Sequence, residues 1–203
     1  FSNGNETSKY SATFGYLNRE GILSDIGFQR GQVRLNSEFK LSDRLTVGEH
    51  LNVSFSNSTG NAGQSIQFAQ RLSPLVPVFD DLGRFAGAYS NANGLSNAGN
   101  PLAEVARNAD NFFKQTRIIG DIYATYRIAD GLTAKTSIGG DLSLLNTRNF
   151  FATNPEAPEP RATNTLTERN QQTYNWTWTN TLNYTKTFGE HTVNALLGVE
   201  DKR

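Results

Sequence analysis

The sequence predicts an all-β protein whose antiparallel strands follow one another up and down, as in a segment of a transmembrane β-barrel with long extracellular loops. Apolar and polar side chains alternate over several segments, which indicates strands because successive strand side chains point to opposite faces. The chain is rich in Asn, Thr, Ser, Gly and aromatic residues, which suit strands and turns better than helices. Short and long connections also alternate along the chain. These three observations together predict the fold class.

The first predicted strand covers residues 7–18, with Tyr10, Ala12, Phe14 and Tyr16 on one face. Residues 30–40 and 46–58 are predicted to form a hairpin around Asp43, since Asp favours turns through side-chain bonds to the backbone. A turn centred there brings the apolar faces of the two strands together. The pairs that this register predicts are Leu35 with Leu51, Val33 with Val53, Asn36 with His50, and Arg34 with Asn52.

The periodicity is lost between residues 59 and 111, a stretch rich in Asn, Gly, Ser and Ala. A short helix is expected over residues 101–109, which begin with a proline. About fifty residues without strands are unusual inside a compact soluble domain. They are ordinary in an external loop of a large barrel.

A second hairpin is predicted from residues 113–128 and 132–144, because Asp130-Gly131 is a strong turn signal. Its register pairs Ile122 with Ile138 and Ile118 with Leu142. Residues 146–170 are polar and contain three prolines, so they are expected to form a loop.

The strictest alternation lies in residues 173–185, where Thr and Asn alternate with a mostly aromatic and aliphatic set. After a turn around Gly189, residues 193–199 alternate in the same way and complete a third hairpin. Its parity places Trp176 and Trp178 on the apolar face, where an interfacial girdle is the favoured role and stacking on sugar the alternative.

The order of connections favours a barrel over a sandwich. All short turns fall at one end of the predicted sheet and all long loops at the other, as in outer-membrane barrels. Aromatic residues near both strand ends match interfacial girdles: Phe39, Tyr126 and Tyr184 near the short turns, and Tyr16, Phe55 and Trp176 toward the long loops.

Charge placement agrees with lipid on one side of the sheet. A charge on the lipid face costs about 2–4 kcal/mol at mid-bilayer, and Glu49 is the only in-strand charge expected there. The opposite, polar face is expected to line a lumen. Its predicted lining residues are Arg34, Asn36, His50, Asn52, Arg117, Asp121, Lys135 and Asp141.

The composition argues against several kinds of binding site and of membrane segment. The chain has 203 residues, with 19 Lys plus Arg against 19 Asp plus Glu, so no nucleic-acid partner is predicted. It contains no Cys, hence no disulfide and no thiolate metal site. Its apolar runs are too short for a transmembrane helix, but a spanning strand needs only about 9–11 residues.

Chemical sites are weakly indicated. The two histidines, His50 and His191, lack the neighbours of a metal site, and no cofactor is predicted. Asp121 and Asp141 resemble a glycosidase pair less than lumen charges paired with Arg117 or Lys135, so no catalytic residue and no enzyme activity is predicted. Six residues of the longest loop are candidates to touch cargo or a partner, with loop packing as the equal alternative: Phe79, Asp80, Asp81, Arg84, Phe85 and Tyr89.

Three runs of sequence resemble a known family. The runs 15–22 (GYLNREGI), 77–83 (PVFDDLG) and 179–189 (TNTLNYTKTFG) look like parts of the barrel of SusC/RagA-type TonB-linked outer-membrane proteins of Bacteroidetes. The resemblance implies a barrel of about 22 strands with a plugged lumen. It also implies the outer membrane of a Gram-negative cell as location.

The same resemblance implies partners: outer-membrane lipid, a SusD-type surface lipoprotein, the TonB complex acting through a plug, and an oligosaccharide or peptide cargo too large for porins. Residues 1–203 contain no recognisable plug or TonB box, so a partial barrel of about seven strands with two unpaired edges is expected. The main alternative is a soluble or surface β-sandwich that binds carbohydrate. An outer-membrane enzyme or a passive porin has no positive sign in the sequence.

Overall fold

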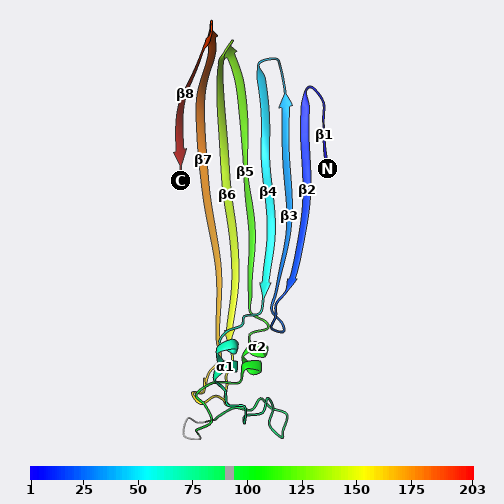
Figure 1. The fold of residues 1–203 in the computed structure, drawn as a ribbon, viewed down its shortest axis with the longest axis vertical. Coiled ribbons are helices and arrows are strands. Elements are labelled where there is room, and N and C mark those ends of the chain that lie inside the picture. The colour runs from blue at the N-terminus through cyan, green and yellow to red at the C-terminus, as the bar shows by residue number, and fades with distance from the viewer. Residues whose placement is uncertain (90–93) are drawn as a thin grey trace.

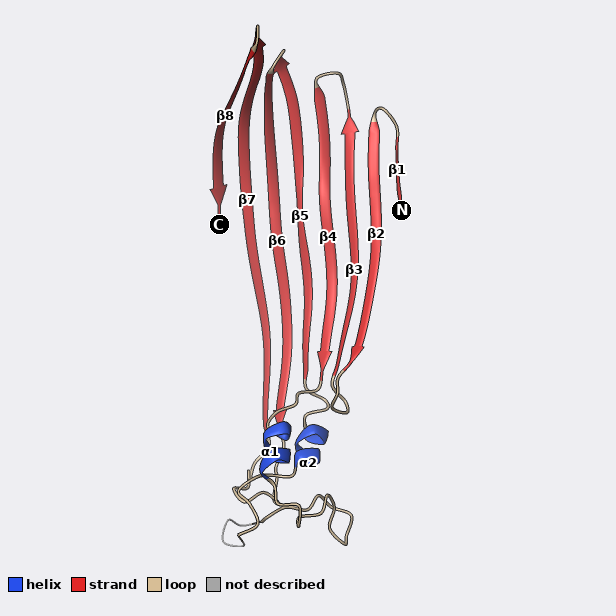
Figure 2. Ribbon diagram, viewed as in Figure 1, coloured by secondary structure: helices blue, strands red, loops and turns tan. Residues whose placement is uncertain are grey.

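A single antiparallel sheet forms most of the molecule (Figures 1 and 2). The computed structural model describes residues 1–89 and 94–203. Eight strands lie side by side in the order of the sequence, so each strand pairs with the strands before and after it. The strands are β1 Ser2–Gly4, β2 Ser8–Glu20, β3 Gly27–Lys40, β4 Leu45–Thr59, β5 Phe112–Ala129, β6 Leu132–Phe151, β7 Thr165–Phe188 and β8 His191–Lys202. This up-and-down sheet confirms the predicted fold class.

All seven predicted strands are present with the predicted registers. Leu35 pairs with Leu51 and Asn36 with His50; Ile122 pairs with Ile138. The eighth strand, β1, was not predicted, because three residues are too few to show an alternation.

The predicted loop over residues 146–170 is shorter in the structure, because β6 continues to Phe151 and β7 begins at Thr165. Polar side chains occupy both faces of this extension, as the pairs Asn146–Asn170 and Thr147–Arg169 show. Further along, the aromatic residues Phe150 and Phe151 are adjacent in sequence. The alternation that reveals a strand is therefore missing from this extension.

The connections are divided between the two ends of the sheet, as predicted. The short turns lie at one end, and the long loops with both helices lie at the other (Figure 1). Helix α2, Pro101–Arg107, matches the expected helix. It starts at Asn100, whose side chain accepts the N–H groups of Leu102 and Ala103, and Pro101 occupies the first turn. Helix α1, Ser65–Arg71, was not predicted; its N-terminus has no side-chain cap.

The sheet has two chemically different faces, defined by cross-strand partners. The apolar face carries Phe14, Val33, Leu35, Leu51, Val53, Ile118, Ile122, Ile138, Leu142, Trp178, Leu182 and Leu197. The polar face carries Lys9, Arg34, Asn36, Glu38, His50, Asn52, Arg117, Asp121, Tyr123, Lys135 and Asp141.

Glu49 is not the only charge on the apolar side, so that expectation is wrong. Lys114 lies within the predicted strand over residues 113–128, and the other charges with this parity lie where the strands are longer than predicted, mostly near the strand ends. The additional charges are Glu20, Lys114, Arg148, Glu168, Lys186 and Asp201.

Neither face of the sheet is covered within the described residues. Gly48 is the only strand residue that is buried there, and Ile122 is 65% exposed. The buried apolar residues all lie in the loops and α2: Ala86, Ala88, Ala98, Ala103, Val105 and Ala157. The alternative of a β-sandwich is therefore wrong, because a sandwich buries one face of each sheet against the other.

Candidate functional site

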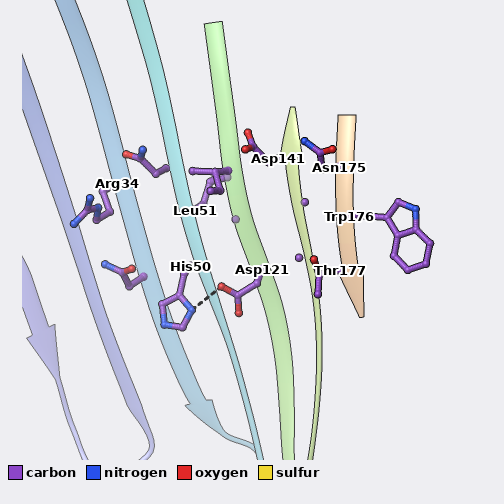
Figure 3. A pocket seen from close by; sticks show the side chains of 14 residues that line it. Arg34, His50, Leu51, Asp121, Asp141, Asn175, Trp176 and Thr177 are labelled. Atoms are coloured by element: carbon purple, nitrogen blue, oxygen red, sulfur yellow. Dashed lines mark hydrogen bonds and ion pairs between the residues drawn. The ribbon is translucent and has the colours of Figure 1, made fainter. Parts of the chain in front are cut away.

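A shallow pocket in the polar face gathers most of the predicted lumen residues (Figure 3). Its volume is about 360 Å³, and side chains from β3 to β7 line it. Arg34, Asn36, His50, Asn52, Asp121 and Asp141 are among its lining residues. The two remaining predicted residues, Arg117 and Lys135, have the same parity but lie outside the lining.

His50 and Asp121 form the polar pair at the edge of this pocket (Figure 3). They are cross-strand partners on β4 and β5, and His50 Nδ1 lies 3.0 Å from Asp121 Oδ1. The Ser137 hydroxyl donates a longer bond of 3.4 Å to the other carboxylate oxygen. The two-residue period of a strand sets both side chains on the same face, so a salt link across the sheet follows from register alone.

Tyr123 extends this pair into a network across the sheet. Its ring stacks on His50 with centroids 5.4 Å apart, and Lys135 Nζ lies 4.4 Å from the ring centroid. The hydroxyl donates to Glu38 Oε2 at 2.9 Å, and Lys9 lies 3.6 Å from the same carboxylate. Five neighbouring strands, β2 to β6, are thereby joined on the polar face.

Gly48 makes room for the Tyr123 ring. The two residues are partners on β4 and β5, and a Cβ at Gly48 would lie 2.4 Å from the ring Cζ and hydroxyl oxygen of Tyr123. Sequence reasoning missed Tyr123 as a site residue. The available signal was its shared parity with Asp121 and its position opposite a glycine.

Arg117 and Asp141 form a second, separate pair on β5 and β6. The guanidinium donates from Nε at 2.9 Å and from Nη2 at 2.6 Å to the two carboxylate oxygens. Asp121 and Asp141 are therefore each held by a different basic side chain, His50 and Arg117. This pairing supports the interpretation of both as lumen charges. Lys135 lies over Tyr123 instead.

The six loop candidates lie in or next to one tight turn. Phe79 and Phe85 form an antiparallel bridge, and their rings stack with centroids 5.3 Å apart. Asp80 Oδ1 accepts the backbone N–H groups of Leu82 and Arg84, at 3.0 and 2.9 Å. Arg84 Nε donates to the other carboxylate oxygen at 2.9 Å.

These bonds divide the six candidates by role. The backbone N–H of Arg84, followed by its guanidinium, lowers the pKa of the Asp80 carboxyl from its ordinary value. Asp80 and Arg84 therefore build the turn, as in the loop-packing alternative. Asp81, Phe79 and Tyr89 are exposed and available for contact.

Further contacts connect the turn to α2, and α2 to the loop over residues 152–164. The Asn100 amide donates to the carbonyls of Val78 and Ala86, both at 2.8 Å. Arg107 donates from both terminal nitrogens to Glu156, with Nη2 at 2.9 Å from Oε2, and Glu156 is only 4% exposed. We call this assembly of the turn, α2 and the 152–164 loop the loop layer.

The loop layer was not predicted from sequence. Arg107 and Glu156 are 49 residues apart, and no local pattern indicates such a contact. Within the described residues no group of three or more His, Cys, Asp or Glu side chains is placed to hold a metal ion. None of the described helices is long and apolar enough to cross a membrane.

Comparison with known proteins finds relatives that match the whole of this chain. No family model matches the chain. Among curated relatives, TonB-dependent receptor P39 of Formosa agariphila is 30% identical over 100% of this chain and 19% of its own length. TonB-dependent receptor P26 of the same organism is 26% identical over 95% of the chain and 19% of its own length. The chain thus spans about a fifth of the curated relatives it matches.

Solved structures have the same fold. The RagAB peptide importer in its closed-closed state superposes with a TM-score of 0.74 at 24% identity, over 98% of this chain and 23% of that one. The ferric-catecholate import receptor Fiu of E. coli superposes with a TM-score of 0.58 at 12% identity, over 99% of this chain and 30% of that one. The chain is therefore similar, over its whole length, to part of curated TonB-dependent receptors, and its open sheet has the fold of part of such a barrel.

Proposed function

We propose that the chain is part of the wall of an outer-membrane importer, with its apolar face against lipid and its polar face toward the lumen. The observation that carries the proposal is the pair of uncovered faces on one sheet. Large apolar side chains on the apolar face are exposed, among them Phe14 at 76%, Ile122 at 65% and Tyr174 at 65%, and such a surface is stable in water only if something apolar covers it. Lipid covers such a face in outer-membrane barrels.

The height of the apolar band supports this orientation. On β4 the band runs from Leu45 to Phe55, and ten steps of about 3.3 Å give a length of about 33 Å. A strand tilt of about 40° reduces this length to a height of about 25 Å, the height of the apolar band in outer-membrane barrels. Beyond Phe55 the outward residues become polar, beginning with Asn57.

The loop layer then faces the cell exterior. It lies at the end that carries all the long connections (Figure 2), and outer-membrane barrels have long loops outside and short turns in the periplasm. In this orientation the lipoprotein partner and the cargo meet the loop layer. The TonB complex acts from the short-turn side through a plug.

Cargo is an oligosaccharide or a peptide too large for porins. The similarity to TonB-dependent receptors and the polar lining support transport rather than catalysis, and the name of RagAB as a peptide importer favours peptide among the two cargo classes. Phe79, Asp81 and Tyr89 are the exposed loop residues that we assign to contact with cargo or the SusD-type lipoprotein.

Membrane fractionation and uptake test the two parts separately. The full-length receptor should stay in the outer-membrane fraction after a urea wash and need detergent for extraction; release by urea alone would overturn the barrel proposal. Deleting its gene should abolish growth on a peptide or oligosaccharide mixture, with rescue by the intact gene. Rescue by a full-length receptor with an inactivated TonB box would overturn the energised mechanism.

A further inference from the structure

A row of polar side chains ends the apolar band on the long-loop side. These residues are successive cross-strand partners on six neighbouring strands, so they form a continuous line on the outward face. Five are amides and one is a lysine: Asn18, Gln29, Asn57, Lys114, Asn146 and Asn170. The preceding row still belongs to the apolar band and includes Tyr16 and Phe55.

Two cationic side chains lie close together, Lys114 in this row and Arg148 in the row beyond it. Lys114 is exposed, with Nζ 4.4 Å from the centroid of the Phe112 ring. Lys114 on β5 pairs with Asn146 on β6. Arg148 lies two residues further along β6, opposite Phe112. Such diagonal positions are about 7–8 Å apart, so one anionic group between them can reach both side chains.

The nearby hydrogen-bonding groups are incompletely satisfied. Arg148 Nε is 4.0 Å from Glu168 Oε1, too far for a hydrogen bond. Arg148 Nε and Asn57 Oδ1 are two of the four buried polar side-chain atoms that lack a hydrogen-bond partner among the described residues. The Asn146 amide donates to Asn170 on the next strand. Glu20, the other acidic residue at this rim, lies on β2, about 14 Å from β5 at about 4.8 Å per strand.

The opposite rim of the same band has different chemistry. Its cross-strand row consists of Leu45, Tyr126, Ala134, Leu182 and Leu197. This row contains neither an amide nor a cation, and the cation Lys186 lies alone two rows beyond it. The line of amides with its two neighbouring cations is therefore found at one rim only.

We propose that Lys114 and Arg148, with the neighbouring amides, bind the head group of a phosphorylated glycolipid in the outer leaflet. The inference rests on the proposed function, which puts this rim at the outer surface of the membrane. A phosphate between the two cations receives charge-assisted hydrogen bonds. The amides donate to and accept from sugar hydroxyls, and the apolar row below contacts the first part of the acyl chains.

Binding of purified lipid A to the detergent-solubilised full-length receptor tests this site, with native mass spectrometry as the readout. The variant Lys114→Gln/Arg148→Gln should bind at least about tenfold more weakly, because it removes both positive charges that donate charge-assisted hydrogen bonds to the phosphate. Glu168→Gln should strengthen binding, because it removes a negative charge beside the phosphate.

Lys186→Gln is the matched control. Lys186 has the same parity and also lies near an aromatic ring, 5.4 Å from the Phe188 centroid, but at the opposite rim. Its substitution should leave lipid A affinity unchanged. Equal affinities for the wild type and the double variant, or an equal loss in the control, would overturn the inference.

Two further arms identify the ligand. Dephosphorylated lipid A should bind the wild type and the double variant equally, and inorganic phosphate at the same concentration should not displace lipid A. Displacement by inorganic phosphate would mean an anion site and not a glycolipid site. The wild type could stay in the membrane after a urea wash but bind lipid A and dephosphorylated lipid A equally well. That result would refute this inference and leave the proposed function standing.

Discussion

The sheet and the loop layer differ in where their contacts come from. The loop layer buries its own side chains: Glu156 is 4% exposed and Ala103 fully covered, and the buried amide of Asn100 bonds two carbonyls. The sheet buries only Gly48 within the described residues, although its backbone is paired across eight strands. The loop layer is therefore stabilised by residues of this chain, whereas the sheet faces need lipid on one side and lumen contents on the other.

The largest expected effect is the loss of the ion pair inside the loop layer. Arg107→Ala leaves the Glu156 carboxylate buried without its partner, which costs about 3–5 kcal/mol for a buried pair. Hydrogen exchange should rise in residues 78–88 and 101–111 of the full-length receptor, with no change in the centre of β5. Arg84→Ala is the comparison, because Arg84 is exposed and pairs with Asp80 in its own turn; any rise in exchange should then stay within residues 78–88 and leave residues 101–111 unchanged. Faster exchange across the sheet in Arg107→Ala would contradict the separation of the two regions.

The next effect concerns the two faces of β5. Ile122→Lys puts a charge into the middle of the apolar band at a cost of about 2–4 kcal/mol. It should lower the yield of heat-modifiable barrel in the outer membrane. Ile119→Lys makes the same change three residues earlier on the polar face, where Ile119 is the partner of Asn52 and Asp141. This variant should assemble normally, and equal assembly of the two would disprove the assignment of faces.

A smaller effect is expected at the contact between Gly48 and Tyr123. Gly48→Ala forces the ring away from Glu38 and His50, because the added Cβ would overlap it. Urea unfolding of the receptor in micelles should show a loss of about 1 kcal/mol that disappears in a Tyr123→Ser background, which is the signature of coupled neighbours. Gly31→Ala, whose added Cβ meets nothing within 4 Å, should have no effect in either background.

The smallest effect is the pH dependence of the turn around Asp80. The folded pKa of this carboxyl is lowered by the N–H and guanidinium of Arg84, so the turn gains stability above the ordinary pKa of 3.8. That stability is lost as the pH falls through the folded value. Hydrogen exchange of residues 80–85, measured at each pH and corrected for the intrinsic pH dependence of exchange, should therefore rise as the pH falls below 3.8. Asp80→Asn, which cannot titrate, should lack this rise.

The strand assignments, the faces and the registers of two hairpins were predictable from sequence. A strand has a period of two, and a turn at Asp43 or Asp130 fixes the register of its hairpin. The pairing of Asn36 with His50 and of Ile122 with Ile138 follows from those turns alone. Residues 146–151 were not predicted as a strand because residues 146–149 are polar on both faces and Phe150 and Phe151 are adjacent aromatic residues, so the sequence shows no alternation there.

The sequence by itself determined which side chains share a face and which ends carry the long loops, because both depend on spacing along one chain. Only the tertiary structure decided that none of the described residues forms a second layer over the sheet, that Tyr123 crosses Gly48, and that Arg107 reaches Glu156. Those contacts join residues far apart in the chain, and their energy depends on shape and burial in space, for which local spacing has no signal.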